Sequence, residues 1–250
     1  MKNKSEYIKF ILPLLIIFFW FIFTYTGKVP PTSLPSLSAV KDTFIEMLKS
    51  GQLSNDLSLS LRRVLAGFFI SSVLGISLGI FMGISSKAKE FFQLILTAIR
   101  QIPMIAWIPL IILWAGIGEV SKIVVILFAA TFSIVVNTMG GVDSTSETYL
   151  EVAKMYGLSK KDTFFKVYLP SALPNIFTGL RLGLGASWMA VVASELIASS
   201  SGIGYRLNDA RSLMRSDVVI VCMIIIGLVG LLMDKLIVLI SHELTPWKKN

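Results

Sequence analysis

The chain has 250 residues, of which 54% are hydrophobic and only 15% are charged, and its formal net charge is +8. A soluble domain carries charge on about a quarter of its residues, so this composition excludes an ordinary soluble protein. Several apolar runs reach the roughly 18 to 20 residues that cross a hydrocarbon core. These runs do not alternate as barrel strands would, and backbone polar groups in lipid need internal partners. The sequence therefore predicts an all-α polytopic membrane protein.

The positive charge has two possible explanations. It could mark a nucleic-acid-binding surface, but no basic stripe with interleaved aromatic residues lies outside the apolar runs. Lysines that flank membrane spans and face the cytoplasmic leaflet explain the charge better. We therefore expect a lipid bilayer as a partner and no nucleic acid. Cys222 is the single cysteine, so no internal disulfide can form.

The first predicted span covers residues 8–26. Its lysine-bearing flank resembles that of a secretory signal peptide, but the apolar run is too long and no small-residue cleavage pattern follows. We therefore expect a retained helix. After a proline-rich stretch, residues 38–58 place apolar side chains at helical spacing beside charged ones. This pattern predicts an amphipathic helix at the membrane interface, too polar to span.

Five further spans are predicted, which gives six in total. Their ranges are residues 61–84, 91–114, 121–139, 175–198 and 217–241. In the second span, Gly75, Gly79 and Gly83 recur at every fourth position, so a neighbouring helix can approach that face closely. In the third span, Pro103 and Pro109 each remove a backbone hydrogen bond. The freed carbonyls then need neighbouring helices or a water-filled cavity.

An even number of spans places both termini on the same side of the membrane. Lysines near both termini, after the second span and within residues 142–172 indicate that this side is cytoplasmic. Five arginines would fall on the other side and count against this orientation: Arg62, Arg63, Arg206, Arg211 and Arg215. Charge alone therefore leaves the orientation open. We expect both termini to be cytoplasmic because the sequence pattern of residues 142–172, described below, indicates a cytoplasmic loop after the fourth span.

That segment, residues 142–172, is a polar loop that predicts two short helices around a hinge. Ser144 to Glu147 fits a capping box with Ser144 as the N-cap, and Gly157 suits a left-handed C-cap. Ser159 begins a second helix with an aromatic face, and Pro170 is expected to end it. This face must be buried on its own subunit or on a partner. Physical reasoning alone leaves both possibilities open.

The order of residues in the loop carries a family resemblance. The loop reads Glu151-Val152-Ala153, then Gly157, then nine residues, then Val167-Tyr168-Leu169-Pro170. This pattern resembles the EAA loop of ABC-importer permeases, with Val152 where alanine is usual. Further stretches resemble the nitrate/sulfonate/taurine branch of that family: residues 60–68, 100–103 with 106–110, 114–119, 170–181, 195–196 with 202–204, and 246–247.

The resemblance implies a single permease domain, residues 1–250, with the MetI-like fold and a cytoplasmic coupling loop at residues 142–172. It implies import of a small solute, an anion such as a sulfonate, taurine or nitrate, with a thiamine precursor or other small aromatic as the alternative. The implied partners are two ATP-binding subunits, an extracytoplasmic solute-binding protein and a second copy of the chain, in the inner membrane of a prokaryote. The resemblance also implies which residues of the loop couple to the ATPase: Glu151, Ala153, Gly157, Phe164, Phe165, Leu169 and Pro170.

The sequence also bears on what the chain itself does chemically. It lacks a phosphate-binding loop, a catalytic cluster and metal-ligand spacing, so we expect a transport subunit without cofactor or metal, driven by ATP hydrolysis on another chain. An ion-driven secondary transporter is the rival function. Such a transporter normally needs several membrane-embedded carboxylates or histidines, and only Glu195 and Asp234 are candidates here.

Several polar residues within the spans are candidates for the solute pathway. Glu195 either helps to close or line the outward mouth, or is a helix-end carboxylate that reaches interfacial water or pairs with Arg206 or another outer arginine. Arg100 and Gln101 precede Pro103 and either line a polar pathway at this break or, for Arg100, snorkel at a cytoplasmic helix end. Asn137 either lines the pathway or links neighbouring helices by hydrogen bonds.

Overall fold

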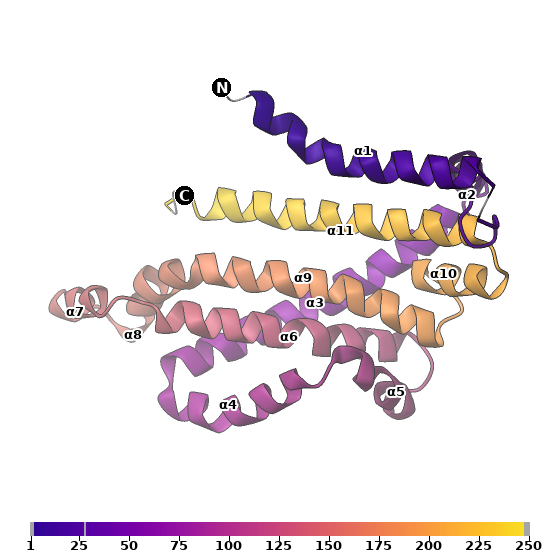
Figure 1. Ribbon diagram of the computed structural model, residues 1–250. Helices are drawn as coiled ribbons and strands as arrows, with labels where there is room; N and C mark the ends of the chain where they lie inside the picture. Colours follow the sequence, from indigo (N-terminus) through magenta and orange to yellow (C-terminus); the bar gives the residue numbers. More distant parts are fainter. Residues whose placement is uncertain (1–2, 28, 248–250) are drawn as a thin grey trace.

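The computed structural model describes residues 3–27 and 29–247, with side chains from residue 11 onward, and the described part is helical with no strand (Figure 1). The first half comprises α1 (Asn3–Tyr25), α2 (Leu37–Lys49), α3 (Gln52–Ile84), α4 (Ser86–Gln101), α5 (Met104–Ala115) and α6 (Glu119–Asp143). The second half comprises α7 (Glu147–Met155), α8 (Lys160–Thr163), the π-helix η1 (Phe164–Tyr168), α9 (Leu169–Ala198), α10 (Ile203–Ser212) and α11 (Ser216–Leu244).

Helix α6 is the centre of the bundle and packs along α3 on one side and α9 on the other. Small residues allow the close approach, as the sequence predicted for α3. A Cβ added at Gly79 would lie 2.6 Å from the Cβ of Thr138 and 2.8 Å from the carbonyl oxygen of Val135, both on α6. Gly179 and Gly183 of α9 meet α6 in the same way. Without a hydrophobic driving force between helices in lipid, this close packing is what holds α3, α6 and α9 together.

The expected amphipathic helix over residues 38–58 is two elements in the structure. Helix α2 ends at Lys49, and Gly51 has φ of 73°, a left-handed conformation that glycine adopts without strain. The polar residues after Gly51 belong to the first turns of α3. This helix therefore begins well before residue 61, where the span was expected to start.

The segment expected as a third span, residues 91–114, is not one continuous helix. It contains α4 and α5, whose axes differ by 101°. The break lies at Ile102 and Pro103: Ile102 takes the extended conformation that a following proline favours, with φ of −81° and ψ of 120°. Pro109, by contrast, lies inside α5.

The polar loop departs from its expected form at both ends. Ser144 closes α6 as its C-cap, and Ser146 rather than Ser144 is the N-cap of α7, so the predicted capping box is wrong by two residues. Pro170 does not end the second helix either, because residues 160–198 form one uninterrupted helix. Just before Pro170, the Leu169 amide donates to the Phe164 carbonyl, and this wider π turn makes room for the proline ring.

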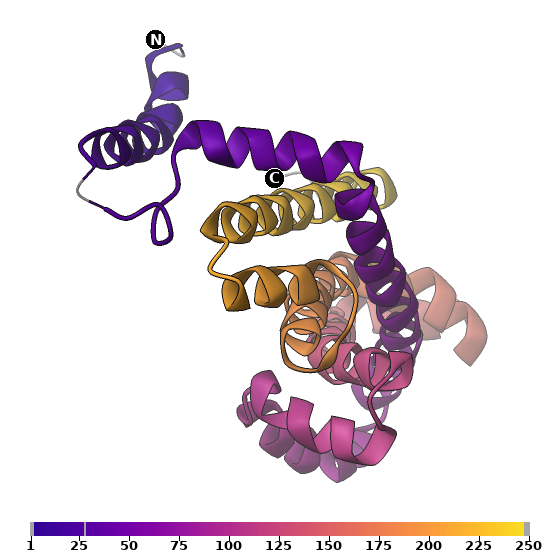
Figure 2. The same ribbon diagram turned by 90° about the vertical axis from the view of Figure 1, so that its right-hand side faces the viewer.

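The arrangement of long helices fits a membrane protein. Among the described residues, four helices can each cross a bilayer by length and composition, and the bent α4–α5 pair could provide a fifth crossing, compared with the six spans that the sequence predicts. Figure 2 shows α1 and the α4–α5 pair on opposite sides of the bundle. The described apolar side chains of α1 are largely exposed. Helices α7 and α8 lie at one end of the molecule and α10 at the other (Figure 1).

Candidate functional site

A groove of about 880 Å³ lies at the α7–α8 end of the molecule. Its walls are α7, the junction of η1 with α9, and the segment after α11. The lining residues are Tyr149, Val152, Ala153, Tyr156, Leu158, Lys166, Val167, Pro170, Ser171, Pro174, Asn175 and Trp247. Tyr149, Tyr156 and Trp247 are 64%, 81% and 57% exposed, so the groove presents an open aromatic surface. We call it the loop groove.

Local sequence signals shape the loop groove. Gly157 has φ of 64°, and the amide of Leu158 donates to the carbonyl of Ala153, which closes α7 as the sequence predicted. The hydroxyl of Ser159 then accepts from the amide of Asp162 at the start of α8, again as predicted. Ala153 is buried and fixes α7 on the rest of the chain. The backbone turn at Gly157 and the cap at Ser159 therefore separate α7 from α8 beside the groove.

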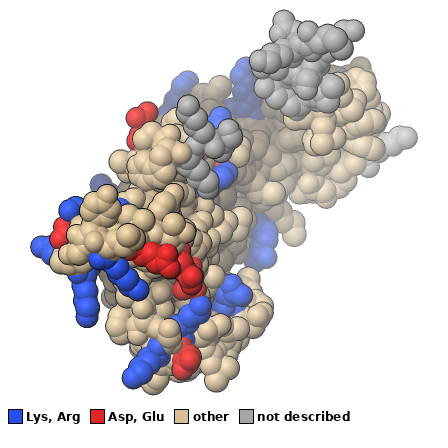
Figure 3. All heavy atoms as spheres, turned by 90° about the vertical axis from the view of Figure 1, so that its left-hand side faces the viewer, with Lys and Arg blue, Asp and Glu red and all other residues tan. Residues whose placement is uncertain are grey.

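Basic side chains surround the loop groove. Lys154, Lys160, Lys161 and Lys166 are all exposed on α7, α8 and η1. Figure 3 views the molecule from this end and shows lysine and arginine side chains standing out from the surface, with fewer acidic ones. The surface around the groove therefore carries an excess of positive charge.

At the opposite end, Glu195 of α9 is 1% exposed and lies within a hydrogen-bonded network. Its carboxylate accepts from the Ser60 hydroxyl at 2.8 Å, from Nη1 of Arg63 at 2.7 Å and from the Gly204 amide at 2.9 Å. Gly202 packs against the same carboxylate. The network joins α3, α9 and the start of α10, and of the two sequence-based interpretations it matches pairing with an arginine.

Arg63 extends this network to a fourth helix. Its guanidinium also donates to both carboxylate oxygens of Glu119, the first residue of α6, at 2.6 and 2.7 Å. Glu119 is more exposed than Arg63 and also binds Nζ of Lys122. Beside this network, Arg206 of α10 donates to the buried carboxylate of Asp56 at 2.8 Å. Paired charges therefore fasten α3, α6, α9 and α10 together.

Three of the remaining pathway candidates lie at the contact between α4–α5 and α6, and Asn137 lies on another face of α6. Arg100 borders two neighbouring cavities at this contact, and Gln101 and Pro103 stand at the break between α4 and α5. Asn137 faces α9 and donates to the carbonyl of Ser133 at 2.8 Å. Asp234 of α11 is not part of this region, because it pairs with Arg181 of α9. The structure thus does not bring Arg100 and Glu195 together.

Residues 71–245, which include the whole of α6, the loop groove helices and α9, match the family described as binding-protein-dependent transport system inner membrane component. The chain belongs to this family. It is the permease, or transport, subunit of an ABC importer, with the all-helical MetI-like fold that the sequence resemblance implied.

Relatives of this permease fall in the predicted branch. A permease assigned to aliphatic sulfonates transport, SsuC of Bacillus subtilis, is 37% identical over 96% of this chain and 87% of its own length. The taurine transport permease TauC of Escherichia coli is 32% identical over 94% of this chain and 87% of its own length. The nitrate import permease NrtB of Synechocystis is 38% identical over 75% of this chain and 68% of its own length.

A solved structure shares the fold of the permease. A chain of an amino acid ABC transporter crystallised with histidines covers 80% of this chain and 98% of its own length, with a TM-score of 0.65 and 17% identity. At that identity, the likeness concerns the fold.

The structure distributes the predicted coupling residues around the loop groove. Ala153 and Pro170 line it, whereas Gly157 shapes it through its backbone. Leu169 packs inward against the neighbouring core of the permease. Glu151 is exposed beside the groove, and the rings of Phe164 and Phe165 contact each other edge to face outside its lining.

Sequence reasoning missed two sets of residues in the permease. The first is the network partners of Glu195: Ser60, Arg63, Glu119, Gly202 and Gly204. All of them stand in the stretches that carry the family resemblance, but their sequence separation hides that they meet. The second set is the aromatic residues Tyr149, Tyr156 and Trp247 of the loop groove. For Tyr149 and Tyr156, the available signal was the presence of aromatic residues in a polar loop; Trp247 lies outside this loop, after α11.

Proposed function

We propose that two copies of this permease form a solute pathway across the inner membrane and that an ATP-binding subunit docks in each loop groove. The open aromatic loop groove, rimmed by exposed lysines, is the observation that carries the proposal. An exposed apolar surface of this size favours burial by a partner. The coupling residues inferred from the resemblance lie in or next to this groove.

The long helix from Lys160 to Ala198 supports a mechanism of coupling. One end of this helix forms a wall of the loop groove, and the other carries Glu195 in the network with Arg63. A docked ATPase that moves the α7–α8 end would therefore tilt a single rigid element. Alternating access follows if the ends of the bundle open and close in turn.

The same assignment sets the orientation that we propose. ATP is cytoplasmic, so the loop groove faces the cytoplasm, together with the amino-terminal end of α1 and the carboxyl-terminal end of α11 (Figure 1). Helix α10 and the Glu195 network then face outward, where a solute-binding protein delivers its cargo. The relatives named for sulfonates, taurine and nitrate support a small anion as that cargo.

Two tyrosines of matched exposure test the docking role of the loop groove. Tyr156 lines the groove and is 81% exposed, whereas Tyr25 ends α1 at the far end of the molecule and is 82% exposed. We expect Tyr156→Ala to weaken ATPase binding about tenfold or more, because a buried aromatic anchor typically contributes at least 1 to 2 kcal/mol to an interface. Tyr25→Ala should leave binding unchanged.

The measurement uses the purified permease with its cognate ATPase, reconstituted in proteoliposomes. Binding, ATP hydrolysis and solute uptake are followed for the native chain and both variants. Hydrolysis-driven uptake that Tyr156→Ala impairs and Tyr25→Ala does not would support the proposal. Solute flux by the permease without ATP or ATPase would contradict it, as would equal behaviour of the two variants.

A further inference from the structure

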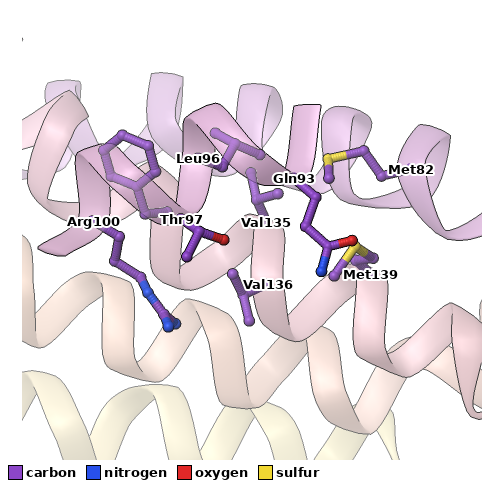
Figure 4. Close-up of a pocket in the computed structure, with 9 residues that line it drawn as sticks. Met82, Gln93, Leu96, Thr97, Arg100, Val135, Val136 and Met139 are labelled. Carbon is purple, nitrogen blue, oxygen red and sulfur yellow. The ribbon is translucent and has the colours of Figure 1, made fainter. Parts of the chain in front are cut away.

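The contact between α4–α5 and α6 contains two neighbouring cavities, of about 180 and 160 Å³. They share Arg100 and Phe132 as lining residues. Figure 4 shows the side chains of Gln93, Thr97 and Arg100 extending from α4 into the first cavity, beside Val136 and Met139 of α6. The first cavity is therefore apolar on the α6 side, and its polar lining comes from α4; in the second cavity Arg100 is the only charged lining residue.

Arg100 lies at about the middle of the membrane-spanning bundle. The α6 walls of the two cavities are formed by residues 128–139, and α6 itself runs from Glu119 to Asp143. A guanidinium at this depth is far from both ends of a helix that is long and apolar enough to span the bilayer. A cation there is costly and typically marks a substrate pathway.

Arg100 differs in its partners from two other arginines of the spanning helices, whereas Arg62, like Arg100, has no ion pair among the described residues. Arg63 binds two carboxylates and Arg181 binds Asp234. Among the described residues, Arg100 has no ion pair and donates no hydrogen bond to another side chain or carbonyl. Its position in the last turn of α4 places it near the partial negative charge of the helix end, which offsets only part of a full charge.

The groups around Arg100 are donors or can act as donors. Gln93 and Thr97 lie on the same face of α4, and the indole Nε1 of Trp107, in the wall of the second cavity, is buried without an acceptor in the described structure. No carboxylate lines either cavity. A cation and one buried unsatisfied donor without a nearby carboxylate suit an anion, and the planar guanidinium matches two oxygens of an oxyanion.

We propose that Arg100, with Gln93, Thr97 and Trp107, forms a binding site for the oxyanion group of the transported solute, a sulfonate or nitrate ion. The inference rests on the proposed function and adds the residue that recognises the cargo within the membrane. The small cavities fit a compact anion, whereas a drug-sized aromatic occupies several hundred Å³. The site lies where the α4–α5 helix is broken, which frees backbone groups for a polar pathway.

The test measures anion binding directly, apart from ATP hydrolysis. Radiolabelled ethanesulfonate is equilibrated by dialysis with the permease–ATPase complex in nanodiscs, and nitrate or neutral ethyl methyl sulfone is added as competitor. We expect nitrate to compete and the sulfone not to. Arg100→Gln should weaken binding about ten- to hundredfold, the usual value of a charged hydrogen bond. Arg100→Lys, which keeps the charge, should weaken binding less.

Arg62→Gln is the matched control, because Arg62 also lies in a spanning helix but lines neither cavity. It should bind as the native chain does. Binding by Arg100→Gln within twofold of native, competition by the neutral sulfone, or no binding of either anion would overturn the inference. A complex that binds the anion through Arg100 but shows no ATP-driven uptake would instead count against the proposed function alone.

Discussion

At the scale of single residues, the charge network around Arg63 and Glu195 shows how polar groups can be kept inside a membrane bundle. The two side chains are 4% and 0% exposed, and their ion pair is completed by the Ser60 hydroxyl and the Gly204 amide. Burial of either charge alone would be costly, so the pair is stable only when every partner is in place. The network therefore fixes the positions of α3, α6, α9 and α10 relative to one another.

We expect Arg63→Met to destabilise the permease by about 3 to 5 kcal/mol, because it leaves the Glu195 carboxylate buried without its cation. The free energy of unfolding in mixed detergent micelles measures the change. Arg62→Met, at the neighbouring position with no buried ion pair, is the control and should cost less than about 1 kcal/mol.

Adding Glu195→Gln to Arg63→Met removes the unpaired charge and should restore part of the lost stability. An Arg63→Met variant as stable as Arg62→Met would show that the network does not hold the helices. If Glu195→Gln instead left stability unchanged and altered uptake alone, Glu195 would act at the gate, as the sequence allowed.

At the scale of elements, the contact between α3 and α6 depends on the absence of side chains. Gly67, Gly75, Gly79 and Gly83 each bring the α3 backbone against side chains of α6. In lipid, van der Waals packing of this kind replaces the hydrophobic effect as the force between helices. On another side of α6, Gly179 and Gly183 of α9 approach Ala130, Ile134 and Asn137, so α6 is held from two sides.

Gly79→Ala should destabilise the bundle by about 1 to 3 kcal/mol, because the new methyl group would lie 2.6 Å from the Cβ of Thr138 and force the two helices apart. Gly227→Ala in α11 is the matched control, since a Cβ there meets nothing within 4 Å. Thermal unfolding of the detergent-solubilised chain compares them. Equal melting temperatures for the two variants would refute the role of this contact.

Residues 160–198 form one continuous helix that passes through Pro170. Pro170 was expected to end a short loop helix, but the π turn at η1 carries the helix through the proline. As a result, the groove-forming segment and Glu195 belong to one element. Two separate helices with a flexible joint would transmit motion less directly.

At the scale of the whole molecule, the two ends have different characters. One end carries the loop groove with its exposed lysines, and the other carries α10 and the Arg63 network (Figure 1). The side chains of α1 and the outer faces of α4 and α5 are rich in exposed large apolar residues. Lipid or a second copy of the chain has to cover these surfaces.

Labelling of single cysteines tests the proposed orientation. Cys222 is replaced by serine, after which Lys160→Cys and Asn208→Cys are made separately; these positions lie on α8 and α10, at opposite ends of the molecule. In intact cells, an impermeant maleimide should label position 208 and not position 160. In inverted membrane vesicles the pattern should reverse. Labelling of both positions from one side would refute the topology.

The sequence by itself determined the membrane environment, the helical class, the family and the local signals of the loop. These signals are local: they are the length of each apolar run, the glycine at position 157 and the N-cap at Ser159. Each depends on residues close in sequence, so it can be recognised without knowing the tertiary contacts. Only the tertiary structure decided which distant residues meet. The network around Arg63 forms because α3, α6 and α9 pack side by side, which brings together Ser60, Glu119, Glu195 and Gly204. Arg100 lies at mid-depth because the chain turns sharply between α4 and α5, at Pro103. These contacts depend on the packing of helices that are far apart in the chain, and no local sequence pattern predicts that packing.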